Sequence, residues 1–350
     1  MKVLQIIDNL YTGGAERVMV NMCNWLDQAG VEIVPVLIDG RGTDLLSEIH
    51  TRTEPVILKR KGRLDFSAAN RLAALMKETD IVHVHMRYNF RYVYLIKWLF
   101  GLSKPIILHD HFGKIKIDKR VPFGFRWIFR PAAYIGVSTE LVQWAKDNLK
   151  TSNKDSFWLL QNAISREGKA AIPCLGNKSA LVLVSNIKKV KNQQFALNLA
   201  EKGDLTIDFI GQIQDENYFN ELIKYVRERQ IERQTRFLHD VTNVQRLLGG
   251  YRLGIHTSIS ETGPLTIIEY LAQGLPFVAY RTGEAAEKIA EEFPEFFLDT
   301  FEVDAWLDRI RYLLESPPDK EKMGAVFDKH FSKENYIAQC LDIYHRILGC

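Results

Sequence analysis

Two glutamates in one stretch, Ser260–Gly274 (SETGPLTIIEYLAQG), have a spacing that suits the binding of a phosphorylated sugar. Glu261 ends a loop after an apolar strand pattern, and Pro264 stands where a first helical position is expected. An apolar helix face follows, so Glu261 would lie beside free helix N–H groups, with Glu269 about two turns further on. Such N–H groups bind anions, and carboxylates accept hydrogen bonds from hydroxyls. Two glutamates at this spacing, without other motifs, are more often a helix cap and a solvated helical residue. Companion motifs elsewhere in the chain favour a binding site instead.

The first two companions are loops that begin helices. Asp8–Arg17 (DNLYTGGAER) contains Gly13 and Gly14, which let the backbone approach a ligand and leave helix N–H groups available. It lacks the dinucleotide pattern GxGxxG, and a plain tight turn is the alternative. Ser185–Asn192 (SNIKKVKN) places Lys191 at the start of a helix, where a positive charge is unfavourable because of the helix dipole. A bound diphosphate would make the lysine favourable there. A solvated basic loop is the alternative there.

The third companion is a polar trio, His109–His111 (HDH), directly after the apolar pattern Pro105–Leu108. The pair His83 and His85 ends another strand pattern in the same way. Polar side chains at the carboxyl ends of parallel strands point at the ligand crevice. Histidine and aspartate can bind metals, but no carboxylate cluster accompanies them, so we expect no metal site. The residues expected to line the cleft are His85, His109 and Asp110.

A basic, aromatic segment follows at Phe112–Arg130 (FGKIKIDKRVPFGFRWIFR). Such segments suit membrane interfaces or single-stranded nucleic acid. The alternative is a helix with its aromatic side chains in the core and its arginines in water. Because Tyr92–Leu102 is also apolar, we expect residues 112–130 to contact an anionic membrane peripherally and expect no nucleic-acid partner.

Composition indicates a two-domain protein of a reducing compartment. The chain has 350 residues, 46% of them hydrophobic, and four cysteines without metal-binding spacing. The start of the sequence does not read as a signal peptide, and no run of about 18 apolar residues is present, so we expect a cytoplasmic protein, which residues 112–130 could attach to the inner face of the membrane. Residues 1–166 hold 24 Lys and Arg against 16 Asp and Glu, whereas residues 167–350 hold 22 against 27. The basic half predicts an anionic partner.

Short apolar runs alternate with helical patterns along the whole chain, which predicts an α/β protein with two Rossmann-like parallel-sheet domains facing a cleft. Residues 165–178 lack periodicity and contain Gly, Pro and charges, so we place the domain boundary there. The predicted domains are residues 1–165 and residues 175–331, followed by a final helix at about 332–350.

Taken together, these motifs resemble glycosyltransferase family 4, whose members are retaining nucleotide-sugar transferases with the GT-B fold. GGAER at Gly13–Arg17 resembles the glycine loop of the family, and QNAI at Gln161–Ile164 resembles its PNGI segment. Lys191–Asn192 matches the KN site. Glu261 and Glu269 match the E-x7-E motif, and the LAQGLPFVA that follows is similar to AMAxGxPVVA.

The resemblance implies a role for each matching residue. Lys191 would neutralise the donor diphosphate, Glu261 would bind sugar hydroxyls, Glu269 would bind the ribose, and His111 would serve the anomeric centre. The implied catalytic residues are His111, Glu261 and Lys191. The implied donor-binding residues are Gly13, Gly14, Asn186, Lys191, Val241, Gly263, Leu265, Thr266 and Glu269. The resemblance also implies no cofactor or metal, a nucleotide-sugar donor, a glycan or lipid-linked acceptor, and a place in surface polysaccharide synthesis. It further implies that the first domain faces the acceptor, with His85, His109 and Asp110 at the acceptor or the cleft, that the second domain binds the donor, and that the final helix packs back on the first domain.

The sequence departs from the family pattern at several positions. Asn186 stands where the family usually has an arginine, Thr262 replaces a common glycine, and Tyr280–Gly283 keeps only one glycine of a pair. Two other functions therefore stay open: an epimerase of sugar nucleotides with the same fold, and a partner subunit that binds the donor without turnover.

Overall fold

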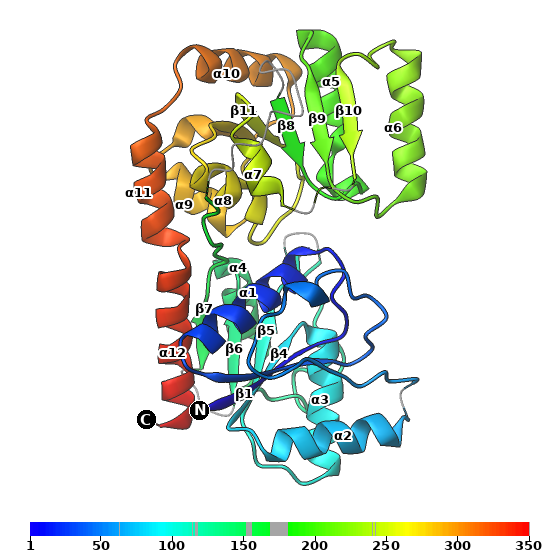
Figure 1. The fold of residues 1–350 in the computed structure, drawn as a ribbon, viewed down its shortest axis with the longest axis vertical. Coiled ribbons are helices and arrows are strands. Elements are labelled where there is room, and N and C mark those ends of the chain that lie inside the picture. Colours follow the sequence, from blue (N-terminus) through cyan, green and yellow to red (C-terminus); the bar gives the residue numbers. More distant parts are fainter. Residues whose placement is uncertain are drawn as a thin grey trace. The chain divides into compact units, whose positions relative to one another are not determined.

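The computed structural model describes residues 1–62, 64–113, 115, 118–151, 156–168, 181–239, 241 and 243–349. The chain divides into two compact units (Figure 1). Unit 1 comprises Met1–Asn162 and Lys333–Cys350, and unit 2 comprises Ala163–Ser332. Cys174 and Cys350 lie outside the described residues, while Cys23 and Cys340 are buried free thiols of unit 1.

Unit 1 contains a parallel sheet with the strand order β3-β2-β1-β4-β5-β6-β7. Its strands are rich in Val, Ile and Leu and are buried in the middle of the sheet, as parallel strands covered by helices must be. The strands are β1 (Lys2–Ile7), β2 (Glu32–Leu37), β3 (Val56–Ile57), β4 (Ile81–His85), β5 (Ile106–Asp110), β6 (Ala133–Gly136) and β7 (Phe157–Leu159).

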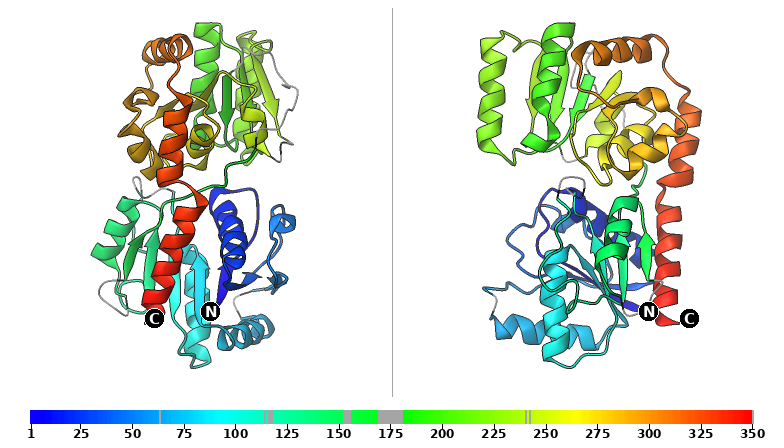
Figure 2. Two further views of the ribbon diagram at one scale, coloured as in Figure 1. Left: turned by 60° about the vertical axis from the view of Figure 1, so that its left-hand side comes forward. Right: turned by 180° about the vertical axis from the view of Figure 1, so that it is seen from behind.

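The helices of unit 1 include one from the far end of the chain. They are α1 (Gly14–Gln28), α2 (Phe66–Lys77), α3 (Arg87–Leu99), α4 (Thr139–Asn148) and α12 (Lys333–Leu348), with a 3-10 turn η1 (Leu46–Glu48). Helix α12 lies beside α1, where the rings of Tyr336 and Trp25 meet edge to face at 5.6 Å (Figure 2). The buried hydroxyl of Tyr344 reaches β1, so the last helix completes the core of the first unit.

Unit 2 is also built on a parallel sheet, with the strand order β10-β9-β8-β11-β12-β13. Its strands are β8 (Leu181–Val184), β9 (Ile207–Ile210), β10 (Thr235–Leu238), β11 (Leu253–His256), β12 (Phe277–Tyr280) and β13 (Phe297–Leu298). Its helices are α5 (Gln193–Gly203), α6 (Glu216–Glu228), α7 (Val244–Leu248), α8 (Leu265–Ala272), α9 (Glu284–Ala290), α10 (Val303–Glu315) and α11 (Lys320–His330), with 3-10 turns η2 (Lys189–Lys191) and η3 (Pro294–Phe296).

The expected fold class, two Rossmann-like units built on parallel sheets, is confirmed. Two local expectations are corrected. Pro264 is the N-cap of α8 rather than its first helical residue, because its ψ of 113° is extended. Strand β5 continues through His109 and Asp110, since both residues pair in register with β6.

Candidate functional site

The candidate site of unit 2 is centred on an ion pair between Lys191 and Glu261. Lys191 ends η2, which follows β8, and Glu261 lies in the loop between β11 and α8. Strands β8 and β11 are neighbours in the sheet, so two loops 70 residues apart in sequence meet at the same edge. The side chains are only 19% and 15% exposed, and the Lys191 ammonium donates a hydrogen bond to a Glu261 carboxylate oxygen.

A neutral histidine lies beside this ion pair. His256, the last residue of β11, has its Nε2 3.8 Å from a Glu261 oxygen. Burial lowers the pKa of His256 to about 4. Burial is the largest single influence on Glu261 and works against its ionisation. The charge and hydrogen bond of Lys191, with smaller contributions from His256 and Ser258, together outweigh burial and hold the pKa of the Glu261 carboxyl below its ordinary value. Near neutral pH the site therefore holds one ammonium, one carboxylate and an uncharged imidazole.

The loops that carry the pair are fixed to the sheet by hydrogen bonds. The Thr257 hydroxyl donates to the Lys191 carbonyl at 2.8 Å, and the Glu261 N–H donates to the Thr282 hydroxyl at 3.2 Å. Within the sheet, the buried Tyr270 hydroxyl accepts a hydrogen bond from the Val184 N–H of β8 at 3.0 Å and is within 3.3 Å of the Ile255 carbonyl of β11. Tyr270 therefore joins the ends of β8 and β11, and with them the loops that follow.

Asn186 has a structural partner of its own. Its side-chain oxygen accepts from the Gln212 N–H at 3.3 Å, which joins the loops after β8 and β9. Gly211 makes this approach possible, because a Cβ at that position would lie 2.2 Å from the Ser185 carbonyl oxygen. An asparagine at position 186 thus supports the strand ends by hydrogen bonding.

Helix α8 presents the remaining residues expected to bind the donor. The first-turn N–H groups of Leu265 and Thr266 have no acceptor within the helix, as in any α-helix. The Thr266 hydroxyl donates to the Val184 carbonyl at 3.1 Å, which holds the helix start over β8. Glu269 and Gly263 are half-buried, and Val241 packs against the core of unit 2.

In unit 1 the glycine loop begins helix α1. Gly13 is its N-cap and Gly14 its first residue. A Cβ on Gly13 would lie 2.3 Å from a Glu16 carboxylate oxygen, whereas one on Gly14 would meet no atom within 4 Å. The Glu16 side chain is flexible and could move away, so neither glycine is tightly enclosed, and Gly14 leaves open space at the helix start.

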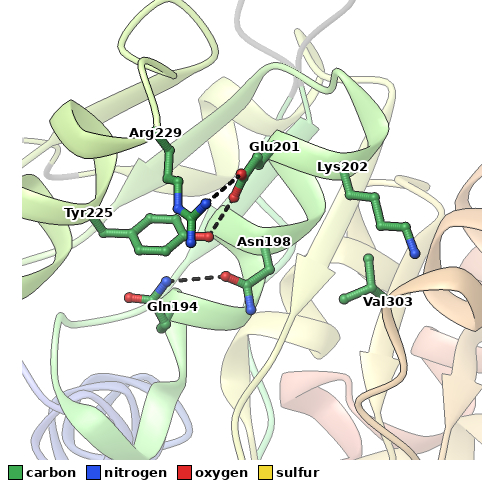
Figure 3. A pocket seen from close by; sticks show the side chains of 7 residues that line it. All are labelled: Gln194, Asn198, Glu201, Lys202, Tyr225, Arg229 and Val303. Carbon is green, nitrogen blue, oxygen red and sulfur yellow. Dashed lines mark hydrogen bonds and ion pairs between the residues drawn. The ribbon is translucent and has the colours of Figure 1, made fainter.

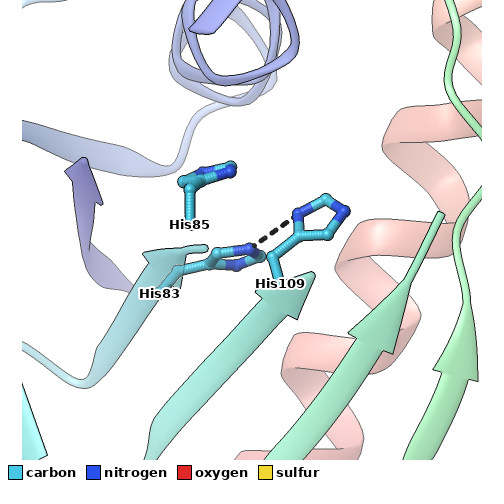
Figure 4. A group of neighbouring side chains, drawn as sticks. All are labelled: His83, His85 and His109. Carbon is cyan, nitrogen blue, oxygen red and sulfur yellow. Dashed lines mark hydrogen bonds between the residues drawn. The ribbon is translucent and has the colours of Figure 1, made fainter. Parts of the chain in front are cut away.

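Four histidines gather at the carboxyl ends of β4 and β5 in unit 1. Figure 4 shows His83, His85 and His109, and His111 stacks on His85 with ring centroids 5.3 Å apart. Burial lowers the pKa of His83 and of His111 to about 3. The pKa values of His85 and His109 are likewise low because of burial. The cluster is therefore uncharged near neutral pH.

His85, His109 and Asp110, which we expect to line the cleft, are buried. Each side chain is at most 1% exposed, because the strands continue through these positions. The Asp110 carboxylate accepts from Arg87 at 2.7 Å and from the Tyr134 hydroxyl at 2.7 Å. Of the residues in the HDH trio, only His111 follows the strand and is partly exposed.

The histidines also form the best metal-ligand geometry among the described residues. One ring nitrogen from each of His83, His85 and His109 lies within 4.8 Å of the other two. Both nitrogens of His83 and both of His85 already lie within hydrogen-bond distance of other side chains, between 2.9 and 3.1 Å. A hydrogen-bonded cluster accounts for these distances, and a metal would have to replace those bonds.

An open pocket of about 820 Å³ lies on helices α5 and α6 and at the start of α10, away from the ion pair (Figure 3). Its polar groups largely pair with one another. The Tyr225 hydroxyl donates to Glu201 at 2.5 Å, and Arg229 lies 3.6 Å from the same carboxylate. None of the residues predicted to bind the donor lines it, so we do not place the site there.

Sequence reasoning missed several residues that the structure brings to these places. His256 carried a signal, because it is a polar residue at the end of an apolar strand pattern. Gln5 carried a similar one within the apolar run VLQII. Tyr344 carried none, since it meets Gln5 across 339 positions of sequence.

Comparison with known proteins identifies the family of the chain. The family model described as Glycosyltransferase Family 4 matches residues 12–161, and that described as Glycosyl transferases group 1 matches residues 167–327. The chain belongs to glycosyltransferase family 4. A curated relative, N-acetyl-alpha-D-glucosaminyl L-malate synthase of Bacillus anthracis, is 25% identical over 309 residues, covering 81% of this chain and 80% of its own.

Solved structures show the same fold in other glycosyltransferases. Anabaena HepE, in complex with UDP and glucose, superposes with a TM-score of 0.82 at 17% identity, covering 98% of each chain. A glycosyltransferase from Rickettsia africae gives 0.81 at 18% identity, covering 99% of this chain and 98% of its own. The chain is thus a glycosyltransferase with the GT-B fold.

Proposed function

We propose that this glycosyltransferase transfers a sugar from a nucleoside-diphosphate donor to a glycan or lipid-linked glycan, with retention of configuration and without a metal ion. The observation that carries the proposal is the partly buried Lys191–Glu261 ion pair at the strand ends beside the start of α8. A diphosphate would give Lys191 a new anionic partner and free Glu261 to accept hydrogen bonds from sugar hydroxyls. The helix N–H groups would add to charge stabilisation as the diphosphate leaves.

The other residues take roles from their positions in each unit. Glu269, on α8, would accept hydrogen bonds from the ribose, and Val241 would contact the nucleobase. Gly14 would bring open backbone to the diphosphate. His111, neutral and partly exposed, would accept or donate a hydrogen bond at the reacting sugar. No protein nucleophile is assigned. We also propose that the reaction belongs to surface polysaccharide assembly, as the resemblance to the family implies.

A donor panel tests this proposal. Ligand that binds only the folded protein at a hundredfold excess over Kd stabilises it by about 2.7 kcal/mol, so the cognate UDP-, GDP- or ADP-sugar should raise Tm by several degrees. That donor should then support transfer to a glycan acceptor in the presence of EDTA. Donor conversion without acceptor would indicate the epimerase, and binding without turnover the inactive partner subunit. Loss of transfer on chelation, restored by Mg²⁺ or Mn²⁺, would contradict metal independence.

We further propose that unit 1 docks on an anionic membrane through an exposed apolar surface on two packed elements. On α3, Leu95, Trp98 and Leu99 are exposed, and in the turn after β5, Phe123, Trp127 and Ile128 are exposed. The elements are in contact, because Tyr94 packs on Phe129 and Phe90 on Phe125. Exposed basic residues flank the turn: Lys119, Arg120, Arg126 and Arg130.

The turn is not the helix that one interpretation of the segment anticipated. The described residues of 112–130 form turns and irregular backbone, while Lys114, Lys116 and Ile117 lie outside the described residues. Phe125 and Phe129 are buried, so alternate aromatics anchor the turn and hold the others outward. Among the described helices, none has both the length and the apolarity to cross a bilayer.

Vesicle binding should depend on both the aromatic and the basic side chains. Burying one large apolar side chain contributes about 1.5–3 kcal/mol, so Trp127→Ser should weaken binding to phosphatidylglycerol-containing vesicles about tenfold or more. Sedimentation with vesicles of phosphatidylcholine alone should show weaker binding, because each basic residue near an anionic surface contributes about 1 kcal/mol. Tyr312→Ser, at an exposed tyrosine of α10, is the matched control. Equal sedimentation of Trp127→Ser and wild type would refute this surface.

A further inference from the structure

A chain of hydrogen bonds runs through the interior of unit 1 from helix α12 to His111. The Gln5 amide donates to the Tyr344 hydroxyl at 2.9 Å, and its carbonyl lies 3.0 Å from His85 Nε2. His85 Nδ1 lies 3.0 Å from His111 Nε2. On the other side of Tyr344, its hydroxyl lies 2.9 Å from His83 Nδ1. Gln5, His83, His85 and Tyr344 are fully buried.

The amide of Gln5 determines where the protons lie along this chain. An amide donates only through nitrogen and accepts only through oxygen, so His85 must carry its proton on Nε2 to donate to the Gln5 oxygen. His85 Nδ1 is then unprotonated and accepts from His111 Nε2–H. His111 is thereby held as the Nε2–H tautomer, with the lone pair on Nδ1. Each bond in this sequence depends on the one before it.

We propose that Gln5 and Tyr344 are positioning residues that fix the tautomer and ring orientation of His111 for sugar transfer. The role of His111 in transfer rests on the proposed function, whereas the tautomer assignment rests on the hydrogen bonds alone. Neither positioning residue touches the site in this arrangement, since both act through His85. The last helix of the chain would then take part in catalysis through one hydroxyl group.

Removal of the Tyr344 hydroxyl should reverse the direction in which protons are donated along this chain of hydrogen bonds. In Tyr344→Phe the Gln5 N–H would face an aromatic ring without an acceptor, and a buried unpaired N–H is less well tolerated than an unpaired carbonyl. Rotating the amide by half a turn lets its N–H donate to His85 Nε2. His85 then carries its proton on Nδ1 and donates to His111 Nε2, so His111 switches to the Nδ1–H tautomer.

Histidine ¹⁵N NMR measures this switch directly, because protonated and unprotonated ring nitrogens have well-separated shifts. Wild-type His111 should show a protonated Nε2, and Tyr344→Phe should show a protonated Nδ1. Gln5→Leu, which removes the amide, should give a mixture of the two. Tyr336→Phe is the matched control, since Tyr336 is also buried on α12 but its hydroxyl contacts Met22 Sδ at 3.7 Å, outside the chain. An unchanged His111 tautomer in Tyr344→Phe, or Nδ1–H in wild type, would overturn the proposal.

Kinetics test the link to transfer. With the tautomer reversed, kcat should fall roughly 10- to 100-fold while KM for the donor changes little, because the effect lies at the reacting sugar. Tyr336→Phe should keep wild-type kcat. A switched tautomer with unchanged kcat would overturn the link between positioning and transfer. If wild type transfers no sugar from any donor, the proposed function fails, and the NMR result still decides the tautomer assignment.

Discussion

Replacement of Lys191 by alanine is expected to lower kcat/KM for sugar transfer by roughly 10²–10³-fold, the usual effect of removing one preorganised charge from a developing anion. Two losses combine in this variant. The departing diphosphate loses its buried cation, and Glu261 keeps its charge in a site where its side chain is only 15% exposed. Part of the loss should therefore appear as weaker donor binding and part as lower kcat.

Lys189→Ala is the matched control for this variant. Lys189 lies two residues earlier in η2, but its side chain is 67% exposed and pairs with Glu221 at 3.7 Å. Because exposed ion pairs contribute little, we expect less than about twofold change in kcat/KM. Steady-state kinetics with the cognate donor measure both variants. Undiminished activity in Lys191→Ala would remove the basis for placing the donor diphosphate at this strand end.

A double-mutant cycle tests whether Lys191 and Glu261 act on the same bound donor. Glu261→Gln removes the carboxylate charge and leaves the Lys191 ammonium without its buried partner. If the two side chains act on the same bound donor, the double variant should lose much less than the product of the single losses. Independent, multiplicative losses would indicate that Lys191 and Glu261 serve separate steps.

The sequence was sufficient to predict the fold class because both sheets consist of short apolar runs separated by helices. Strand ends were harder to predict. His109 and Asp110 are polar and follow Leu108, so hydropathy ended the strand there, yet hydrogen bonds to β6 continue it. Their burial depends on partners that only the fold supplies, such as Arg87 and Tyr134 for Asp110.

The site was predictable where a motif lies on one local element. Glu261 and Glu269 flank the start of α8, as their spacing indicated. The Lys191–Glu261 contact was not predictable from spacing, because it depends on β8 and β11 being neighbours in the sheet. The roles of Gln5 and Tyr344 depend on the last helix packing against the first strand, which no local pattern encodes.

Acid should destabilise unit 1 strongly between pH 6.5 and pH 5. Burial lowers the pKa of His83 and of His111 from 6.5 to about 3 in the folded protein. Between these two values the unfolded chain binds protons that the folded chain does not, so stability falls as the pH falls. Each such histidine costs about 1.4 kcal/mol per pH unit, so these two together cost roughly 4 kcal/mol at pH 5. His85 and His109 shift in the same direction and add to the loss.

Hydrogen exchange of the two sheets measures this effect separately for each unit. Unit 2 has one comparable group at its site, His256, whose pKa burial lowers to about 4. Amides of β4 and β5 should therefore lose protection more steeply than those of β8 and β11 as the pH falls from 7 to 5, after correction for intrinsic exchange. A loss of about 4 kcal/mol is a large part of the 5–15 kcal/mol that stabilises a typical domain.

Substitution tests whether the histidine cluster causes this slope. His109→Leu removes one of the four titrating rings, so the slope of stability against pH should fall by about one proton, even if stability at pH 7 also changes. Equal protection of β4 and β5 at pH 7 and pH 5 would mean that the cluster is already protonated when folded. A protonated His111 has both nitrogens occupied, and the single-tautomer chain through His85 and Gln5 would then not exist.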